Sequence, residues 1–170
     1  QVNMITPDLV ELALYSAWYP LYEGMADFTF EMEIDLPDGL ILSTNGHLKK
    51  KWNEGNRSLS RWTSYRQGWD MMILASPLLR KIEGGNRNTR IEMYYHDLPE
   101  RSLKTFMDGL AAGMDSLNIF YGAPGVKGVL RFAYPPREGW GYSRIPIFVV
   151  AEGYAREEIK KEDGEAQVFH

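Results

Sequence analysis

The sequence has no cysteine, no long apolar run and only three histidines among its 170 residues. Without cysteine, disulfide bonds, thiolate zinc sites and cysteine nucleophiles are excluded, while the cellular compartment stays open because disulfide-free proteins occur everywhere. The sequence has no run of about 18 apolar residues, and it does not start with charged residues followed by an apolar stretch, as a secretion signal would. No transmembrane segment is therefore predicted. The chain begins with Gln1, as expected for a piece of a longer protein.

A strong charge of one sign is also missing. The net charge is -4, the lysines and arginines are dispersed, and the longest basic run covers residues 49–51 beside Trp52. Such a short run is typical of a solvated strand end or hairpin. Nucleic acid is therefore not an expected partner.

Alternating apolar and polar side chains predict a strand with one wet face at residues 26–39. A Pro-Asp-Gly turn follows, and residues 40–46 form a second strand that ends in an Asn-Gly turn, so a hairpin or meander is expected. Further short strands are predicted at 47–52, 59–65 and 71–79. Hydrophobic residues make up 44% of the sequence and aromatics 13%, which suits a sheet-rich globular protein, and the regular strand spacing favours antiparallel sheets.

Residues 82–89 contain two glycines and two asparagines and are the best candidate for a domain boundary, which divides the chain into 1–84 and 85–170. Beyond this boundary we expect a strand at 90–96, a long helix from Pro99 and Glu100 to Gly122, and strands at 128–134 and 144–153. The polar tail at 157–165 is expected to be a loop. The predicted fold class is α+β, an antiparallel domain followed by a small mixed α/β segment with one long helix. The helix has one apolar face, made of Leu103, Phe106, Met107, Leu110, Met114, Leu117 and Tyr121.

The usual signatures of catalysis are absent. His47, His96 and His170 are isolated, and no pair of histidines has the helical spacing of a zinc site. A serine elbow and a phosphate-binding loop are also missing. The closely spaced carboxylates of Glu31 and Glu33 fall on the wet face of their strand. No catalytic residue and no metal ligand is predicted in this chain.

Residues 134–144 stand out because two prolines, two glycines, three aromatics and two arginines lie between two strands. Gly139 and Gly141 would let a peptide ligand approach the main chain, and Trp140 and Tyr142 would form the walls of a side-chain pocket. The alternative is a structural loop whose aromatics pack on the core.

The order of these features resembles the aminopeptidase N family of zinc peptidases. That family has a Trp-Tyr/Phe-Pro segment, then an alternating strand, a Pro-x-Gly turn and a strand ending in Asn/Ser-Gly. The resemblance continues through residues 71–79, similar to the last strand of the family's N-terminal β-domain, and through residues 90–122, similar to the opening of its thermolysin-like catalytic domain. The first part of the match is carried by Trp18, Tyr19, Pro20, Pro37, Gly39, Asn45 and Gly46.

This resemblance implies that the antiparallel sheets are part of a β-sandwich or saddle and that the chain contributes substrate-cleft walls to a zinc-dependent metallopeptidase. The peptide substrate and the zinc ion belong to the full-length parent, whose zinc-binding helix would follow His170, so the fragment has no cofactor and is inactive alone. The family's exopeptidase loop has a glutamate that holds the substrate's amino terminus. In this sequence Tyr142 stands at that position, and Glu138, which is nearby but offset, is the candidate substitute for substrate binding.

Two other interpretations stay open. The first is a non-catalytic module that binds proteins or peptides on an aminopeptidase-like architecture, which the altered loop favours. The second is a carbohydrate- or peptide-binding module, which would require Trp52, Trp62 and Trp69 on one exposed platform, whereas most of these side chains are expected to be packed. A fragment of a catalytic domain would also expose apolar surface, so a homodimer of the fragment is expected.

Overall fold

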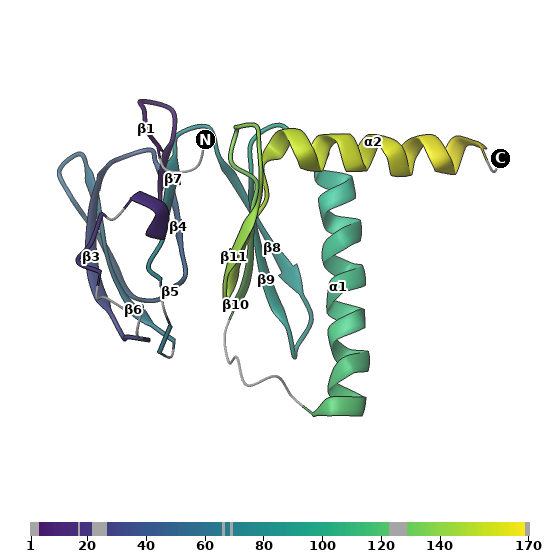
Figure 1. Cartoon of the computed structure of the whole chain (residues 1–170), viewed down its shortest axis with the longest axis horizontal. Coiled ribbons are helices and arrows are strands. Elements are labelled where there is room, and N and C mark those ends of the chain that lie inside the picture. Colours follow the sequence, from purple (N-terminus) through teal and green to yellow (C-terminus); the bar gives the residue numbers. More distant parts are fainter. Residues whose placement is uncertain are drawn as a thin grey trace.

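The computed structural model describes residues 4–16, 18–21, 27–65, 67–68, 70–122 and 129–168. These residues include three β-sheets and two α-helices, which confirms the predicted α+β class (Figure 1). The layers follow one another from the three-stranded sheet through the four-stranded and five-stranded sheets to the helices.

The first half of the chain forms two small antiparallel sheets. One has the order β1-β2-β7-β4 and the other β3-β6-β5. A short 3₁₀ helix, Leu14–Ser16, follows β2. The strands are β1 (Met4–Ile5), β2 (Val10–Leu12), β3 (Glu31–Pro37), β4 (Ile41–Thr44), β5 (Gly46–Glu54), β6 (Arg57–Ser64) and β7 (Ile73–Ser76).

Strand β3 has the predicted alternation, with Ile34 buried and Glu31, Glu33 and Asp35 exposed. The predicted hairpin between β3 and β4 is wrong, because β3 pairs with β6 and β4 pairs with β7. After β3 the backbone N–H of Asp38 donates to the carbonyl of Asn56, 2.8 Å away in the β5–β6 turn. This contact holds the turn against β6, and the chain then crosses to the other sheet.

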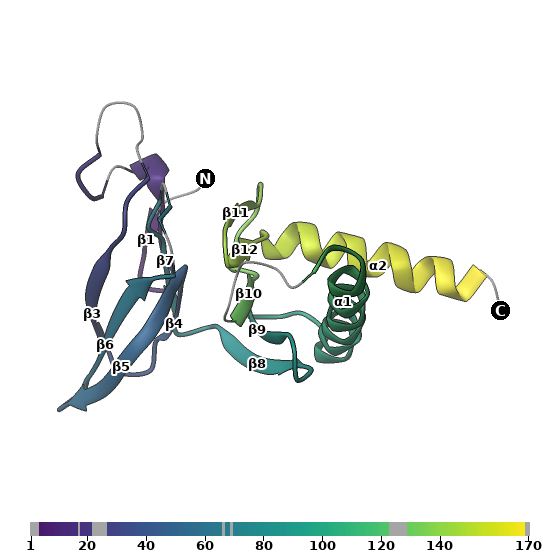
Figure 2. The same cartoon turned by 90° about the horizontal axis from the view of Figure 1, so that it is seen from below.

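The second half forms a mixed five-stranded sheet with the order β11-β12-β10-β9-β8 (Figure 2). Its strands are β8 (Arg80–Gly85), β9 (Arg90–Tyr95), β10 (Val129–Ala133), β11 (Tyr142–Arg144) and β12 (Ile147–Val149). The central strands β9, β10 and β12 are parallel, and both edge strands are antiparallel to their neighbours. The predicted single strand at 144–153 is wrong: the chain leaves β11 at Arg144, turns at residues 145–146 and forms β12, which ends at Val149. Pro146 has no N–H for a ladder.

Each face of this sheet packs against a different layer. Alternate residues of β9 point to opposite sides, so Tyr94 joins the core shared with β2 and β7, while Met93 joins the core under helix α1 (Glu100–Tyr121). The first of these cores contains residues from both halves of the chain, including Leu74 and Val149. The halves are therefore joined by a continuous apolar core.

Helix α1 begins after Pro99 and ends at Gly122, as predicted. Its 22 residues give a length of about 33 Å, whereas the six residues of β9 span only about 20 Å. The apolar face is consequently covered only over the first turns, where Leu103 and Met107 are buried. Leu117 and Tyr121, which the pattern assigns to the same face, are exposed.

Gly84 lets α1 approach β8 closely. A Cβ atom on this residue would lie 2.1 Å from the Sδ of Met107, so a larger residue would have to displace that side chain. The predicted boundary between 84 and 85 lies inside β8, which pairs along its whole length with β9. Residues 80–84 therefore belong to the five-stranded sheet.

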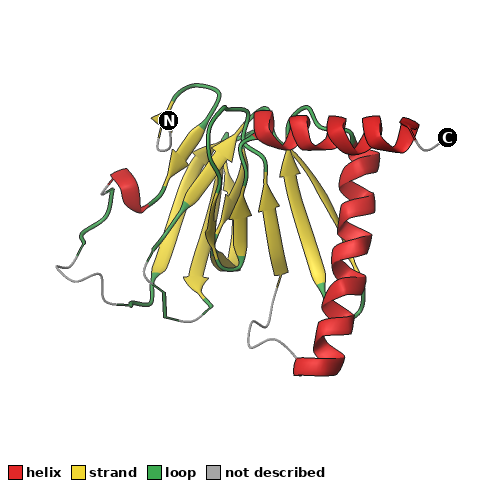
Figure 3. Ribbon diagram, turned by 45° about the vertical axis from the view of Figure 1, so that its right-hand side comes forward, coloured by secondary structure: helices red, strands yellow, loops and turns green. Residues whose placement is uncertain are grey.

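The tail predicted to be a loop is helix α2 (Glu152–Val168), which crosses one end of α1 (Figure 3). Glutamate and lysine are good helix formers, and the segment pairs them at helical spacing, as in Lys161 with Glu158. Ala155 and Ile159 contact the core under α1. The high polarity of this segment therefore marks a solvated helix face. Within the described ranges, neither helix is long and apolar enough to cross a membrane.

Candidate functional site

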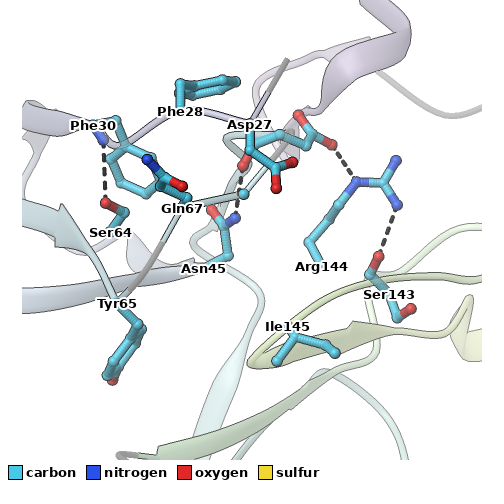
Figure 4. Close-up of a pocket in the computed structure, with 12 residues that line it drawn as sticks. Asp27, Phe28, Phe30, Asn45, Ser64, Tyr65, Gln67, Ser143, Arg144 and Ile145 are labelled. Carbon is cyan, nitrogen blue, oxygen red and sulfur yellow. Dashed lines mark hydrogen bonds and ion pairs between the residues drawn. The ribbon is translucent and has the colours of Figure 1, made fainter. Parts of the chain in front are cut away.

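Strand β11 borders a pocket of about 400 Å³ between the two halves of the chain. The β11 side contributes Ser143, Arg144 and Ile145, and the opposite side comes from loops of the first half (Figure 4). β11 is the last strand of its sheet, and among the described residues it pairs only with β12. The first half contributes Asp27, Phe28, Phe30, Asn45, Ser64, Tyr65, Gln67, Gly68 and Asp70.

Asp70 is the centre of a buried polar cluster on the wall of this pocket. Its carboxylate accepts a hydrogen bond from the Tyr19 hydroxyl at 2.8 Å and another from Nε of Arg144. Burial and the Asp70 hydrogen bond raise the pKa of Tyr19, so the phenol stays a donor. Arg144 also donates from Nη1 to the Ser143 carbonyl at 2.7 Å. The cluster thus fixes β11 to the first half of the chain.

Asn45 positions the same wall from below. Its side-chain amide donates to the Asp70 carbonyl at 2.9 Å and accepts from the Met72 N–H at 3.1 Å. The next residue, Gly46, lies so close to β6 that a Cβ would be 3.2 Å from the Thr63 carbonyl. The Asn-Gly pair therefore orders residues 70–72 and does not form a hairpin turn.

The predicted loop at 134–144 is held by Arg137, whose side chain is 4% exposed. Its guanidinium makes two hydrogen bonds to the fully buried Glu11, at 2.5 and 2.8 Å. It also donates to the carbonyl oxygens of Glu138 and Trp140, at 3.3 and 2.8 Å. A desolvated bidentate pair of this kind fixes the path of the loop.

The five residues predicted to bind substrate have separate surroundings. Trp140 is 86% exposed, whereas Tyr142 packs against the core beside Glu11, where burial and that carboxylate raise its pKa. The Glu138 carboxylate lies against Gly153 in the first turn of α2. Gly139 has φ of 99°, and Gly141 lies against the Val149 carbonyl, so both glycines are required by the backbone. None of these five is among the described residues that line the pocket.

A second pocket, of about 440 Å³, lies between the three-stranded sheet and β8, β9 and β10. Trp62 lines it from β6 and is 6% exposed. Trp52 pairs with Leu59 of β6. Leu59 is three positions from Trp62 on that strand, and side chains alternate between faces, so Trp52 points to the opposite face of the sheet from Trp62. These two rings therefore do not share the platform that the carbohydrate- or peptide-binding interpretation requires, and Trp69 lies outside the described residues.

Histidine and carboxylate chemistry is sparse in both pockets. His47 lines the second pocket with its ring 5.4 Å from that of Tyr65, and His96 lies 3.5 Å from a carboxylate oxygen of Glu152. Within the part of the chain that the structure describes, no three histidine, aspartate or glutamate side chains are grouped to hold a metal ion. His170 lies outside that part.

Several polar residues of these walls were missed from the sequence. Asp70 and Arg144 are 74 positions apart, and no local pattern connects them. A signal did exist for Glu11, Glu92 and Arg131, because each interrupts an apolar run where a charge is expected only if it is paired.

No family model matches the chain, and no curated protein matches its sequence.

Proposed function

We propose that this chain forms part of the substrate cleft of a zinc-dependent metallopeptidase similar to aminopeptidase N. The proposal expects the zinc ion and its ligands in a longer parent protein, so the described chain binds peptide without hydrolysing it. The observation that supports it most is the position of β11, an edge strand beside a pocket. An extended peptide can pair with an unpartnered strand edge while one of its side chains enters a neighbouring pocket.

The charge of the pocket suggests which peptide groups it accepts. Asp70 is matched by Arg144, but no ion pair within the described ranges involves Asp27, which is exposed at the pocket. One carboxylate is therefore left to attract a cation. The proposed ligand is a peptide that places a basic side chain or its free amino group in this pocket.

The altered loop supports a second candidate function, a peptide-binding module without catalysis. The side chain of Tyr142, which replaces the glutamate of the exopeptidase loop, packs toward the core. A free amino terminus would therefore not meet a carboxylate at that position. In this alternative the same edge strand and pocket bind peptide, and no hydrolysis follows.

A peptidase assay on the full-length protein separates the two functions. The enzyme proposal expects hydrolysis of peptides or aminoacyl arylamides that a zinc chelator abolishes and added zinc restores. Peptide binding without hydrolysis, measured by fluorescence anisotropy and mass spectrometry, would identify the binding module instead. If the protein neither binds nor cleaves peptides, both proposals fail.

The Asp27→Asn variant tests the pocket itself. Because Asp27 is exposed, the change removes charge without disturbing the core, and we expect binding of basic peptides to weaken about three- to tenfold. Asp38→Asn, at the exposed turn after β3, is the matched control. Equal weakening by both variants would show that overall charge, and not this pocket, attracts the peptide.

A further inference from the structure

The second pocket has a composition that the peptide proposal does not use. Its lining includes apolar side chains of the first half and of β10, namely Leu36, Ile41, Leu42, Leu48, Trp62 and Val129. The same lining contains Lys51, Lys81, Arg90 and Arg131, with Glu92 as its one carboxylate. The pocket is therefore amphipathic, with an excess of positive charge in its lining.

The ion pairs of this region leave that excess in place. Lys81 and Arg90 share Glu83 and Glu92, at distances from 2.6 to 3.4 Å, and Arg131 contacts Glu92 at 2.9 Å. Four cations thus face two carboxylates. No ion pair among the described residues involves Lys51, whose ammonium group is free to meet a ligand from β5.

The charged part of the lining is held in a fixed position by hydrogen bonds within the protein. Arg131 is 3% exposed and donates to the carbonyl oxygens of Thr44 and Gly46, at 3.2 and 2.9 Å, while its guanidinium lies 5.6 Å from the Trp62 ring centroid. Glu92 is fixed by a 2.8 Å hydrogen bond from the Tyr94 hydroxyl. These contacts hold the cationic wall in position before any ligand arrives.

We propose that this pocket binds a carboxylate carried on an aliphatic chain, with the carboxylate at Lys51 and the chain against Leu36, Leu42 and Val129. A volume of about 440 Å³ lies in the range of small-molecule sites, which are mostly apolar with a few placed polar groups. The bound carboxylate would compensate charge that the protein leaves unmatched, and the chain would leave water. This site shares only Tyr65 with the lining of the β11 pocket, and it does not depend on any peptidase activity.

Isothermal titration of the chain with decanoate, decanol, decyltrimethylammonium and acetate tests both halves of the proposal. We expect saturable binding of decanoate at one site per chain. Decanol, decyltrimethylammonium and acetate should each bind at least about tenfold more weakly, because each loses the charge match or the apolar contact. Equal binding of decanol and decanoate would overturn the proposal, since apolar adsorption would then suffice.

Two lysines of β5 supply the matched variants. Lys51 pairs with Ser60 on the pocket side, whereas Lys50 pairs with Arg61 and lies over Trp52 on the opposite face. Lys51→Ala should weaken decanoate binding about three- to tenfold, Lys51→Arg should retain it, and Lys50→Ala should leave it within about twofold. Equal losses in Lys50→Ala and Lys51→Ala would mean that only the general field of β5 matters, which contradicts the site.

Methyl chemical shifts locate the bound chain. Decanoate should shift the methyl signals of Leu42 and Val129 in both wild type and Lys51→Arg. The main competing apolar surface is the exposed end of α1, with Leu117, Ile119 and Phe120. Methyl shifts confined to Leu117 and Ile119 would overturn the proposal even if the titration shows binding.

Discussion

Arg137 and Arg144 reach carboxylates that the first half of the chain buries, whereas Arg57 and Arg61 on β6 pair with carboxylates on the wet face of β3. The side chain of Arg144 is 6% exposed and that of Arg57 is 46% exposed. Both sets look alike as ion pairs, but water screens only the second. The buried pairs therefore fix how the two halves of the chain meet. The exposed pairs add little to a sheet that is already held together by the backbone hydrogen bonds between β3 and β6.

The largest effect is expected when a buried arginine loses its partner. Glu11→Gln keeps the shape of the side chain but leaves Arg137 charged and desolvated, which should lower the free energy of unfolding by about 3–5 kcal/mol. Urea denaturation followed by tryptophan fluorescence measures this loss. Replacing both partners, as Glu11→Leu with Arg137→Met, should restore most of it. A loss below about 1 kcal/mol in Glu11→Gln would show that buried and exposed pairs do not differ.

An intermediate effect is expected at Glu92, which several partners share. Burial alone would raise its pKa, but the hydrogen bond from Lys81 and the charge of Arg131 outweigh burial and lower the pKa below its usual range. Because the folded value lies below the unfolded value of about 4.3, Glu92 stabilises the fold above that pH, and the contribution is lost as the pH falls through the folded value.

Glu92→Gln should therefore cost about 2 kcal/mol at neutral pH and make the melting temperature less dependent on pH below about 4.5. Thermal melts followed by circular dichroism from neutral to acidic pH give both quantities. Parallel curves for wild type and variant across the acidic range would refute the lowered pKa.

The smallest effect is expected on the exposed face of β3 and β6. Arg57→Ala removes a 2.6 Å contact with Asp35, yet it should change the free energy of unfolding by no more than about 1 kcal/mol, and by less in high salt. The same urea titration at two salt concentrations checks this. A larger, salt-insensitive loss would place the β3 pairs in the same class as Glu11 and Arg137.

The sequence pattern predicted those elements that depend mainly on interactions between neighbouring residues. The alternation of residues 31–37 and the apolar spacing of residues 100–121 depend on neighbours in sequence, and both elements were found. Strand partners depend on distant residues, which is why β3 was given β4 as a partner instead of β6. The tail at 157–165 was misjudged because high polarity was equated with a loop.

The candidate site was only partly predictable for the same reason. Tyr19 and Asn45 were singled out by the resemblance, and both contact Asp70. The roles of Asp70 and Arg144 could be recognised only from the fold, which brings the two side chains together. Among the predicted loop residues, Tyr142 follows the alternative interpretation of aromatics that pack on the core, while Trp140 does not.

Gly84 lies in the segment whose glycines were taken as a sign of a domain boundary, yet it packs against Met107 of α1. A methyl group there would lie 2.1 Å from the Sδ atom, so the Met107 side chain would have to move within the core under α1. The absence of a side chain at one strand position thus leaves room for a methionine between helix and sheet. A pair of glycines in a sequence can therefore indicate close packing as well as a flexible segment.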